Sequence, residues 1–237
     1  MARWRCFRFD VAELKQIFFV TGTDTGIGKT ALTAFLARFL CGRGVNVAAL
    51  KPICSGGRDD ARTLQAALNK TLTLDEINPW PFPAPIAPLL AARRERRRVR
   101  LGDVLAFVRT MHKCFDLLLI EGAGGLLSPL GENFNSRDLL IALRAAPIIV
   151  CPNRLGAVNQ ALLTLEALPE NFRARARVVL MSPLNPDAAT ASNAKLLAEF
   201  FDAKRIFTLP WLGKRFEAGL ALQNPKVGRM LRALVGI

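Results

Sequence analysis

The sequence predicts an α/β protein in which a mostly parallel β-sheet carries helices on both faces. Short apolar, β-branched segments alternate with longer segments of helical periodicity along the chain. Several apolar segments are continuous runs, as strands buried on both faces require. The 237 residues are 51% hydrophobic and 22% charged, which is typical of a single folded domain and excludes a disordered chain. No apolar run reaches the roughly 18 residues of a membrane span.

The elements alternate in order along the chain. We expect strands at 16–21, 46–51, 116–121, 146–152, 177–182 and 206–210. We expect helices at 29–41, 60–68, 101–113, 136–144, 157–168 and 187–201. In the first helix Leu32, Leu36 and Phe39 recur at helical spacing, and Gly42 follows its end. The proline-rich segment 78–88 is predicted to be an ordered loop, because its prolines exclude a regular helix.

Residues 1–16 are expected to be a basic extension, and residues 17–237 the folded domain. The extension has arginines at positions 3, 5 and 8 and no apolar stretch behind them, so we do not expect a secretory signal. The five cysteines are scattered without a CxxC pair, which favours reduced thiols and a cytoplasmic location. A single histidine excludes a Cys/His zinc cluster.

The net charge of +14 is typical of nucleic-acid-binding proteins. Part of it comes from the six arginines between Arg93 and Arg100. No aromatic residues for base stacking are interleaved with them. We therefore expect a solvated helix end or loop, and no nucleic-acid partner, while an anionic substrate or partner stays open.

The segment from Gly22 to Thr30, GTDTGIGKT, joins an apolar strand to an amphipathic helix. Gly26 and Gly28 let successive N–H groups point into one hollow at the helix N-terminus, where anions bind. Lys29 adds a cation for the β- and γ-phosphates, and the Thr30 hydroxyl is placed to ligate Mg²⁺. The sequence departs from the pattern GxxxxGK[ST] because its first glycine, Gly22, lies one residue too early. The succession of strand, loop and helix nevertheless predicts a P-loop NTPase-like domain.

Polar side chains follow the next two long strands. Lys51 closes the second and Ser55 follows it, and Glu121 ends the third. The carboxyl ends of parallel strands share one edge of a sheet, so we expect these residues beside the phosphate loop. Glu121 is suited to Mg²⁺ and water there. Asp59 and Asp60 begin a helix, where an N-cap role is the alternative to a metal role for either one.

Three motifs in series, GTDTGIGKT, LKPICSGG and IEGAGGLLSPL, resemble those of the dethiobiotin synthetase family. NPWPF, NRLGAVN and LPWL extend the resemblance over residues 17–213. It implies an ATP- and Mg²⁺-dependent ligase of biotin biosynthesis, which carboxylates 7,8-diaminononanoate with CO₂ and closes the ureido ring of dethiobiotin through a carbamate and a carbamic-phosphoric anhydride. It also implies a homodimer in which the substrate carboxylate is bound across the interface.

The resemblance implies roles for particular residues. The catalytic residues would be Lys29 and Lys51. Nucleotide would be bound by Thr25, Gly26, Ile27, Gly28, Lys29, Thr30, Pro210 and Trp211. Mg²⁺ would be held by Thr30, Asp60 and Glu121, with Asp60 preferred over Asp59 because DDARTLQ aligns with the family's Asp-Ala-x-x-Leu-Gln. Substrate would be bound by Thr25, Lys51, Ser55, Glu121, Gly122, Gly124, Leu155, Gly156 and Asn159.

The sequence leaves the nucleobase preference open. Met181 stands where the family usually has an asparagine that reads adenine, and a thioether makes no paired donor and acceptor contact. Asn185 is a possible substitute, and other nucleoside triphosphates are an alternative to ATP.

Two other functions remain as alternatives. A cobyrinate-type amide ligase would normally carry a glutaminase domain with a catalytic cysteine and histidine, which these 237 residues lack. A nucleotide-switched ATPase that binds nucleic acid or a protein partner is motivated by the charge. Septum-site and chromosome-partitioning ATPases are disfavoured, because Asp24 occupies the position of their second lysine.

Overall fold

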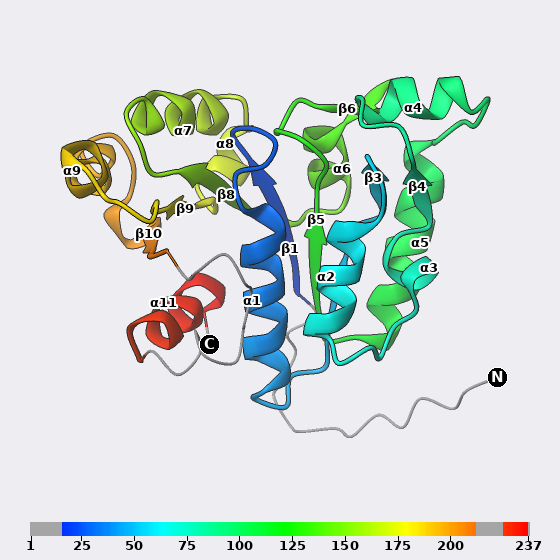
Figure 1. The fold of residues 1–237 in the computed structure, drawn as a ribbon, viewed down its shortest axis with the longest axis horizontal. Helices are drawn as coiled ribbons and strands as arrows, with labels where there is room; N and C mark the ends of the chain where they lie inside the picture. The colour runs from blue at the N-terminus through cyan, green and yellow to red at the C-terminus, as the bar shows by residue number, and fades with distance from the viewer. Residues whose placement is uncertain (1–15, 212–224, 237) are drawn as a thin grey trace.

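Six parallel strands form the central sheet, in the order β10-β9-β8-β1-β5-β2 (Figure 1). The computed structural model describes residues 16–211 and 225–236. The strands are β1 (Gln16–Gly22), β2 (Val47–Leu50), β5 (Leu117–Glu121), β8 (Ala146–Pro152), β9 (Arg177–Met181) and β10 (Ile206–Leu209). All six lie within a residue or two of the predicted strands. Most of their residues are buried, which explains their continuous apolar runs.

Helices cover both faces of this sheet (Figure 1), which confirms the predicted fold class. The six predicted helices are α1 (Lys29–Cys41), α2 (Asp59–Ala67), α5 (Leu101–Cys114), α6 (Ser136–Ala142), α7 (Ala157–Glu166) and α9 (Ala188–Leu197). Sequence patterns did not identify α3 (Leu74–Ile77), α4 (Pro88–Arg94), α8 (Glu170–Arg173), the 3₁₀ helix η1 (Ala203–Arg205) or α11 (Pro225–Val235). They also missed the antiparallel pair β6 (Pro129–Gly131) and β7 (Phe134–Asn135).

The strand order brings the site together. The chain crosses from β1 through α1 to β2, returns to β5 between them, and then continues to β8 on the other side of β1. Because all six strands are parallel, the carboxyl ends of β1, β5 and β2 are neighbours at one edge of the sheet. The predicted meeting of the loops after these strands is therefore confirmed.

The prediction that residues 78–88 form only a loop is wrong. Trp80–Phe82 is a short strand, β4, which pairs in parallel with β3 (Ile53–Ser55), and α4 begins at Pro88. Pro81 is tolerated because a two-stranded sheet consists of edge strands, where a missing N–H need not break a ladder. Proline also suits the first turn of a helix, where its N–H would have no intrahelical partner. The two-stranded sheet carries Phe82 into the core, where its side chain is fully buried.

The arginine run begins in the last turn of α4 and continues into the following loop, and it is solvated, as predicted, with all six arginines exposed. Arg93 donates two hydrogen bonds of 2.9 Å to the Glu132 carboxylate. Arg97 lies 4.8 Å from the centre of the Phe82 ring and donates to the Pro81 carbonyl. These two arginines thus anchor the loop to β4 and to the β6–β7 turn.

Across residues 16–211 and 225–236, every helix is too short or too polar to cross a bilayer.

Candidate active site

The loop between β1 and α1 has the backbone shape that phosphate binding requires. Gly26 and Gly28 have φ angles of +72° and +97°, in the left-handed region that side chains disfavour. Gly28 precedes α1, so its neighbours carry the unpaired N–H groups of a helix N-terminus. Lys29 is buried, and its ammonium donates a 2.6 Å hydrogen bond to the Asp24 carbonyl across the loop. The Thr33 hydroxyl also donates to the Lys29 carbonyl and fixes the first helical turn.

Gly28→Ala should damage this loop more than Gly26→Ala. Both changes place a side chain at positive φ, which costs about 1–3 kcal/mol. The φ of Gly28, +97°, is farther than the +72° of Gly26 from the left-handed region that a side chain can adopt, and the new Cβ at Gly28 would also push aside the flexible Met181 methyl group at 2.9 Å. We expect a lower melting temperature and weaker nucleotide binding for Gly28→Ala than for Gly26→Ala. Equal values for the two variants would show that the Met181 contact does not constrain the loop.

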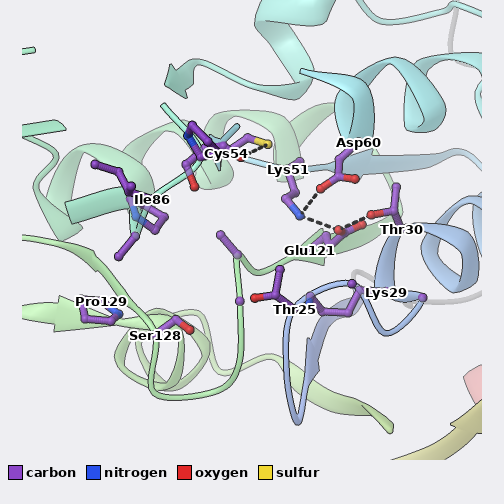
Figure 2. Close-up of a pocket in the computed structure, with 18 residues that line it drawn as sticks. Thr25, Lys29, Thr30, Lys51, Cys54, Asp60, Ile86, Glu121, Ser128 and Pro129 are labelled. Atoms are coloured by element: carbon purple, nitrogen blue, oxygen red, sulfur yellow. Dashed lines mark hydrogen bonds and ion pairs between the residues drawn. The ribbon is translucent and has the colours of Figure 1, made fainter. Parts of the chain in front are cut away.

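Three side chains from different elements meet beside this loop (Figure 2). The Lys51 ammonium lies 2.6 Å from Oε1 of Glu121, at the end of β5, and 2.7 Å from Oδ2 of Asp60 on α2. The side chains of Lys51 and Glu121 are 4% and 0% exposed, so this pair is effectively shielded from water. Thr30 joins the cluster by donating a 2.8 Å hydrogen bond to Glu121 Oε1. Asp59, in contrast, is exposed and paired with Arg62, so the structure brings Asp60 to the cluster and not Asp59.

Neither aspartate is the N-cap residue that sequence reasoning allowed. The residue before the first turn of α2 is Arg58, and both Asp59 and Asp60 are within the helix. Their carboxylates still lie in the first turn, where negative charge complements the helix dipole.

The charges of the cluster set the protonation of its lysines. Burial and, to a lesser extent, the nearby Lys51 cation lower the pKa of Lys29 to about 8. Burial alone would also lower the pKa of Lys51, but Glu121 and Asp60 outweigh it and hold that pKa above its usual value. The Asp60 carboxyl has a lowered pKa, because attraction to Lys51 and hydrogen bonds from Lys51 and Thr30 outweigh its burial. Lys51 is therefore a permanent cation at neutral pH.

A cavity of about 610 Å³ opens above the cluster, within the range of small-molecule sites (Figure 2). Its lining includes ten of the residues predicted from sequence. They are Thr25, Gly26, Gly28, Lys29, Thr30, Lys51, Ser55, Asp60, Glu121 and Gly124. The opposite wall is mostly apolar and was not predicted as part of the site. It consists of Cys54, Pro85, Ile86, Ala87, Pro88, Ala123, Ser128 and Pro129.

Comparison with known proteins places the chain in a family. Residues 16–215 match a family model described as an AAA domain. The ATP-dependent dethiobiotin synthetase BioD of Akkermansia muciniphila is 36% identical over 78% of this chain and 88% of its own length. The protein of the same name from Anaeromyxobacter dehalogenans strain 2CP-1 is 35% identical over 92% of this chain and 97% of its own. The chain is a dethiobiotin synthetase family member.

The fold of this dethiobiotin synthetase family member is shared with P-loop ATPases. The MinC:MinD cell division complex of Aquifex aeolicus matches with a TM-score of 0.61 at 14% identity, covering 94% of this chain and 96% of that one. A ParA family ATPase from Chlorobium tepidum TLS matches with a TM-score of 0.59, also at 14% identity, covering 92% and 97%. At this level of identity the likeness shows the α/β fold alone.

Several residues assigned by resemblance lie outside the lining of the cavity. They are Ile27, Gly122, Leu155, Gly156, Asn159, Pro210 and Trp211. Gly122 has a packing reason, since a Cβ there would lie 3.1 Å from the Phe19 ring and 3.2 Å from Ser136 Oγ. Leu155 is 83% exposed, just before α7, and Gly156 is the residue preceding that helix. A dethiobiotin synthetase site made by one chain alone therefore does not include the α7 loop.

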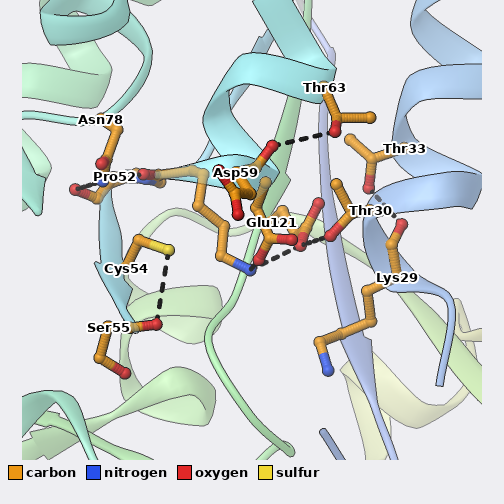
Figure 3. A network of polar contacts seen from close by, with 12 residues as sticks. Lys29, Thr30, Thr33, Pro52, Cys54, Ser55, Asp59, Thr63, Asn78 and Glu121 are labelled. Carbon is orange, nitrogen blue, oxygen red and sulfur yellow. Dashed lines mark hydrogen bonds and ion pairs between the residues drawn. The ribbon is translucent and has the colours of Figure 1, made fainter. Parts of the chain in front are cut away.

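Asn78 is a residue of the site that sequence reasoning quoted in a motif but gave no role. Its side chain is fully buried, and Nδ2 donates to the carbonyls of Lys51 and Pro52 at 2.8 and 3.2 Å (Figure 3). The Lys51 N–H in turn donates to the Ile77 carbonyl. These bonds fix the backbone that carries the central cation, and a polar residue within the NPWPF segment was the available signal.

The oxygen ligands of the cluster fit Mg²⁺ when a nucleotide is present. Oε2 of Glu121 is buried and has no hydrogen-bond partner, and the Thr30 hydroxyl and Asp60 carboxylate lie beside Glu121 and Lys51. No group of three or more His, Cys, Asp and Glu side chains suited to a metal occurs within the described segments. Mg²⁺ usually takes one or two carboxylates and completes its shell with phosphates and water. Thr30, Asp60 and Glu121 provide the few oxygen ligands that Mg²⁺ needs beside phosphates and water. They do not form a complete metal site made of protein ligands alone.

Proposed function

We propose that this chain carboxylates 7,8-diaminononanoate with CO₂, in an ATP- and Mg²⁺-dependent reaction, and closes the ureido ring of dethiobiotin. The observation that carries the proposal is the shared cavity. The phosphate loop and the Lys51–Asp60–Glu121 cluster line the same 610 Å³ space, so a phosphate chain and an amine substrate can meet there. The membership of the dethiobiotin synthetase family supports this reaction.

In this proposal the loop of residues 25–30 binds the triphosphate. The N–H groups at the start of α1 and the Lys29 ammonium neutralise the charge that spreads over the γ-phosphoryl oxygens during transfer. Thr30, Asp60 and Glu121 would hold Mg²⁺, which would supply positive charge to the phosphate oxygens. Phosphoryl transfer needs mainly this positioning and neutralisation, and no histidine is required.

Lys51 acts as a fixed cation rather than as a base, because its carboxylate partners keep it protonated. One amine of the substrate adds to CO₂ and loses a proton to water to form a carbamate, and Lys51 with Ser55 stabilises this anion. The carbamate oxygen attacks the γ-phosphorus and expels ADP, which gives a mixed anhydride. The second amine then attacks the activated carbonyl, loses a proton and expels phosphate, and the ring closes. The apolar wall containing Ile86 and Pro129 accommodates the hydrocarbon chain.

The substrate carboxylate is proposed to lie near the α7 loop of a partner subunit. Leu155 and Leu163 are 83% and 64% exposed, and burial in a dimer would remove this apolar surface from water. A partner loop would bring Gly156, Asn159 and the start of α7 to a cavity that one chain leaves open. We also propose a cytoplasmic location, supported by the free thiols of Cys41, Cys54, Cys114 and Cys151 in the described segments.

Purified protein with Mg²⁺, ATP, bicarbonate and diaminononanoate should release ADP and phosphate in step with dethiobiotin. The measurement is phosphate release followed in parallel with dethiobiotin by mass spectrometry, and omission of the diamine is the control. We expect phosphate release to fall to background without the diamine, because the carbamate is the phosphoryl acceptor. ATP turnover of the same rate with and without the diamine would contradict the proposed reaction.

A further inference from the structure

The phosphate loop follows β1, and different strands lie on the two sides, or flanks, of β1. Glu121 on β5 and Lys51 after β2 lie on one side of β1, whereas β8, β9 and β10 lie on the other (Figure 1). Under the proposed function the terminal phosphate reaches toward Lys51 and Glu121. A triphosphate is a linear chain, so its nucleoside end must then lie at the carboxyl ends of β8, β9 and β10.

Met181 on this second flank contacts the phosphate loop, as does Val150 of β8, whose carbonyl accepts a hydrogen bond from the Thr23 N–H. Met181 ends β9, in register with Pro152 of β8 and Leu209 of β10. A Cβ on Gly28 would lie 2.9 Å from the Met181 methyl group and 3.9 Å from its sulfur, so the thioether side chain lies across the loop. Any nucleoside that leaves the loop on this side passes Met181.

The side-chain amide of Asn153, which lies next to Met181 in the fold, is already used within the protein. Asn153 is 1% exposed, and its Nδ2 donates to the Thr190 carbonyl and to Ser182 Oγ at 3.2 and 3.4 Å. Its Oδ1 accepts a 2.9 Å hydrogen bond from Asn193. The Met181 carbonyl accepts a 2.8 Å hydrogen bond from the Asn153 N–H. These groups join β8, β9 and α9, and they cannot read a base edge without breaking this network.

Two apolar side chains, both partly accessible to solvent, lie at or just beyond the ends of β9 and β10: Met181 and Trp211. Trp211, two residues beyond the end of β10, is 44% exposed, and a thioether offers at most a weak acceptor. Such surfaces attract the faces of all bases to a similar degree. Strong discrimination between related ligands requires polar groups that a wrong ligand would leave unpaired, and a pocket of apolar contacts discriminates weakly.

We infer that Met181 makes this a phosphoryl-donor site of relaxed base selectivity. ATP, GTP, CTP and UTP would all support ring closure, with kcat/KM values within about tenfold of one another, because the contacts shared by all four are made to the triphosphate. The inference rests on the proposed function, because that function sets the direction in which the triphosphate lies.

The test uses the full chain and two independent readouts. The first is dethiobiotin formation with each of the four nucleoside triphosphates at saturating diamine. The second is displacement of a fluorescent ATP analogue by each nucleotide without diamine, which does not depend on the reaction. Displacement constants within about tenfold of one another are expected. A preference for ATP above about a hundredfold in displacement would overturn the inference, whatever the assay of dethiobiotin gives.

The two readouts separate this inference from the proposed function. Dethiobiotin formed with ATP alone, together with selective displacement by ATP, would leave the reaction in place and remove the inference. Equal displacement by all four nucleotides, without dethiobiotin from any of them, would support the inference and remove the reaction.

Two variants at Met181 and one at Asn185 test which residue sets the base selectivity. Met181→Asn adds an amide that can pair with adenine N6 and N7, and it should widen the ratio of ATP to CTP displacement at least about tenfold. Met181→Leu keeps an apolar contact and should leave the four constants close together. Asn185→Ala removes the exposed amide four residues beyond Met181 and should not change the ratios. If instead Asn185→Ala abolishes an existing preference for ATP, Asn185 reads the base and the role given to Met181 is wrong.

Discussion

Replacing Lys29 by alanine should reduce kcat for dethiobiotin formation by at least about a thousandfold. Lys29 is buried and supplies the cation of the phosphate loop, with its ammonium held across the loop by the Asp24 carbonyl. The γ-phosphoryl oxygens carry the charge of the transition state, so loss of this cation removes stabilisation that the ground state does not need to the same extent. Single-turnover phosphate release measures the chemical step directly.

Lys113→Ala is the matched control for this change. Lys113 is an exposed residue near the end of α5, and its removal lowers the net charge by the same amount. We expect its turnover to equal that of the parent protein, which would separate a local effect from a change in overall charge. Turnover of Lys29→Ala near that of Lys113→Ala would remove the phosphate loop from the site.

Replacing Lys51 by alanine should affect both catalysis and stability. The Glu121 carboxylate is 0% exposed and would lose the ammonium at 2.6 Å, and breaking a buried ion pair from one side typically costs about 3–5 kcal/mol. Ring formation should fall by about a hundredfold or more, because the carbamate loses its cation. The dissociation constant of ATP should change by less than about fivefold, since the loop of residues 25–30 is intact. Calorimetric unfolding, isothermal titration and the dethiobiotin assay measure these three quantities.

A double variant separates the effect of Lys51 on stability from its effect on catalysis. Lys51→Met with Glu121→Gln removes both charges while keeping the length of each side chain, so most of the lost stability should return. Activity should stay low, because neither the cation nor the carboxylate is restored. In Lys51→Ala, an affinity for ATP that falls as far as ring formation would place Lys51 with the nucleotide instead of the substrate.

Most of the central sheet could be predicted because its signals are local. Continuous apolar runs such as residues 117–120 are required when a strand is buried on both faces, and they are visible without any contact partner. The elements that were missed, among them β4 and α4, are short and are stabilised by their neighbours. The backbone N–H of Trp80, for example, donates to the Pro52 carbonyl, and the Trp80 ring packs edge-on against Phe107 with the ring centres 5.9 Å apart. Propensity alone gives no signal for an element that depends on such contacts.

The sequence by itself determined the order of strands, loops and helices along the chain, the position of the phosphate loop, and which polar residues end the buried strands. Each of these depends on side-chain periodicity or on a few neighbouring residues. Only the tertiary structure decided that Asp60 joins Lys51, that Asn78 holds the Lys51 backbone, and that Met181 lies across Gly28. Lys51 and Glu121 are 70 positions apart, and Thr30 and Glu121 are 91 apart. Their contacts follow from the order of strands in the sheet, which is set by packing between distant segments and not by any local pattern.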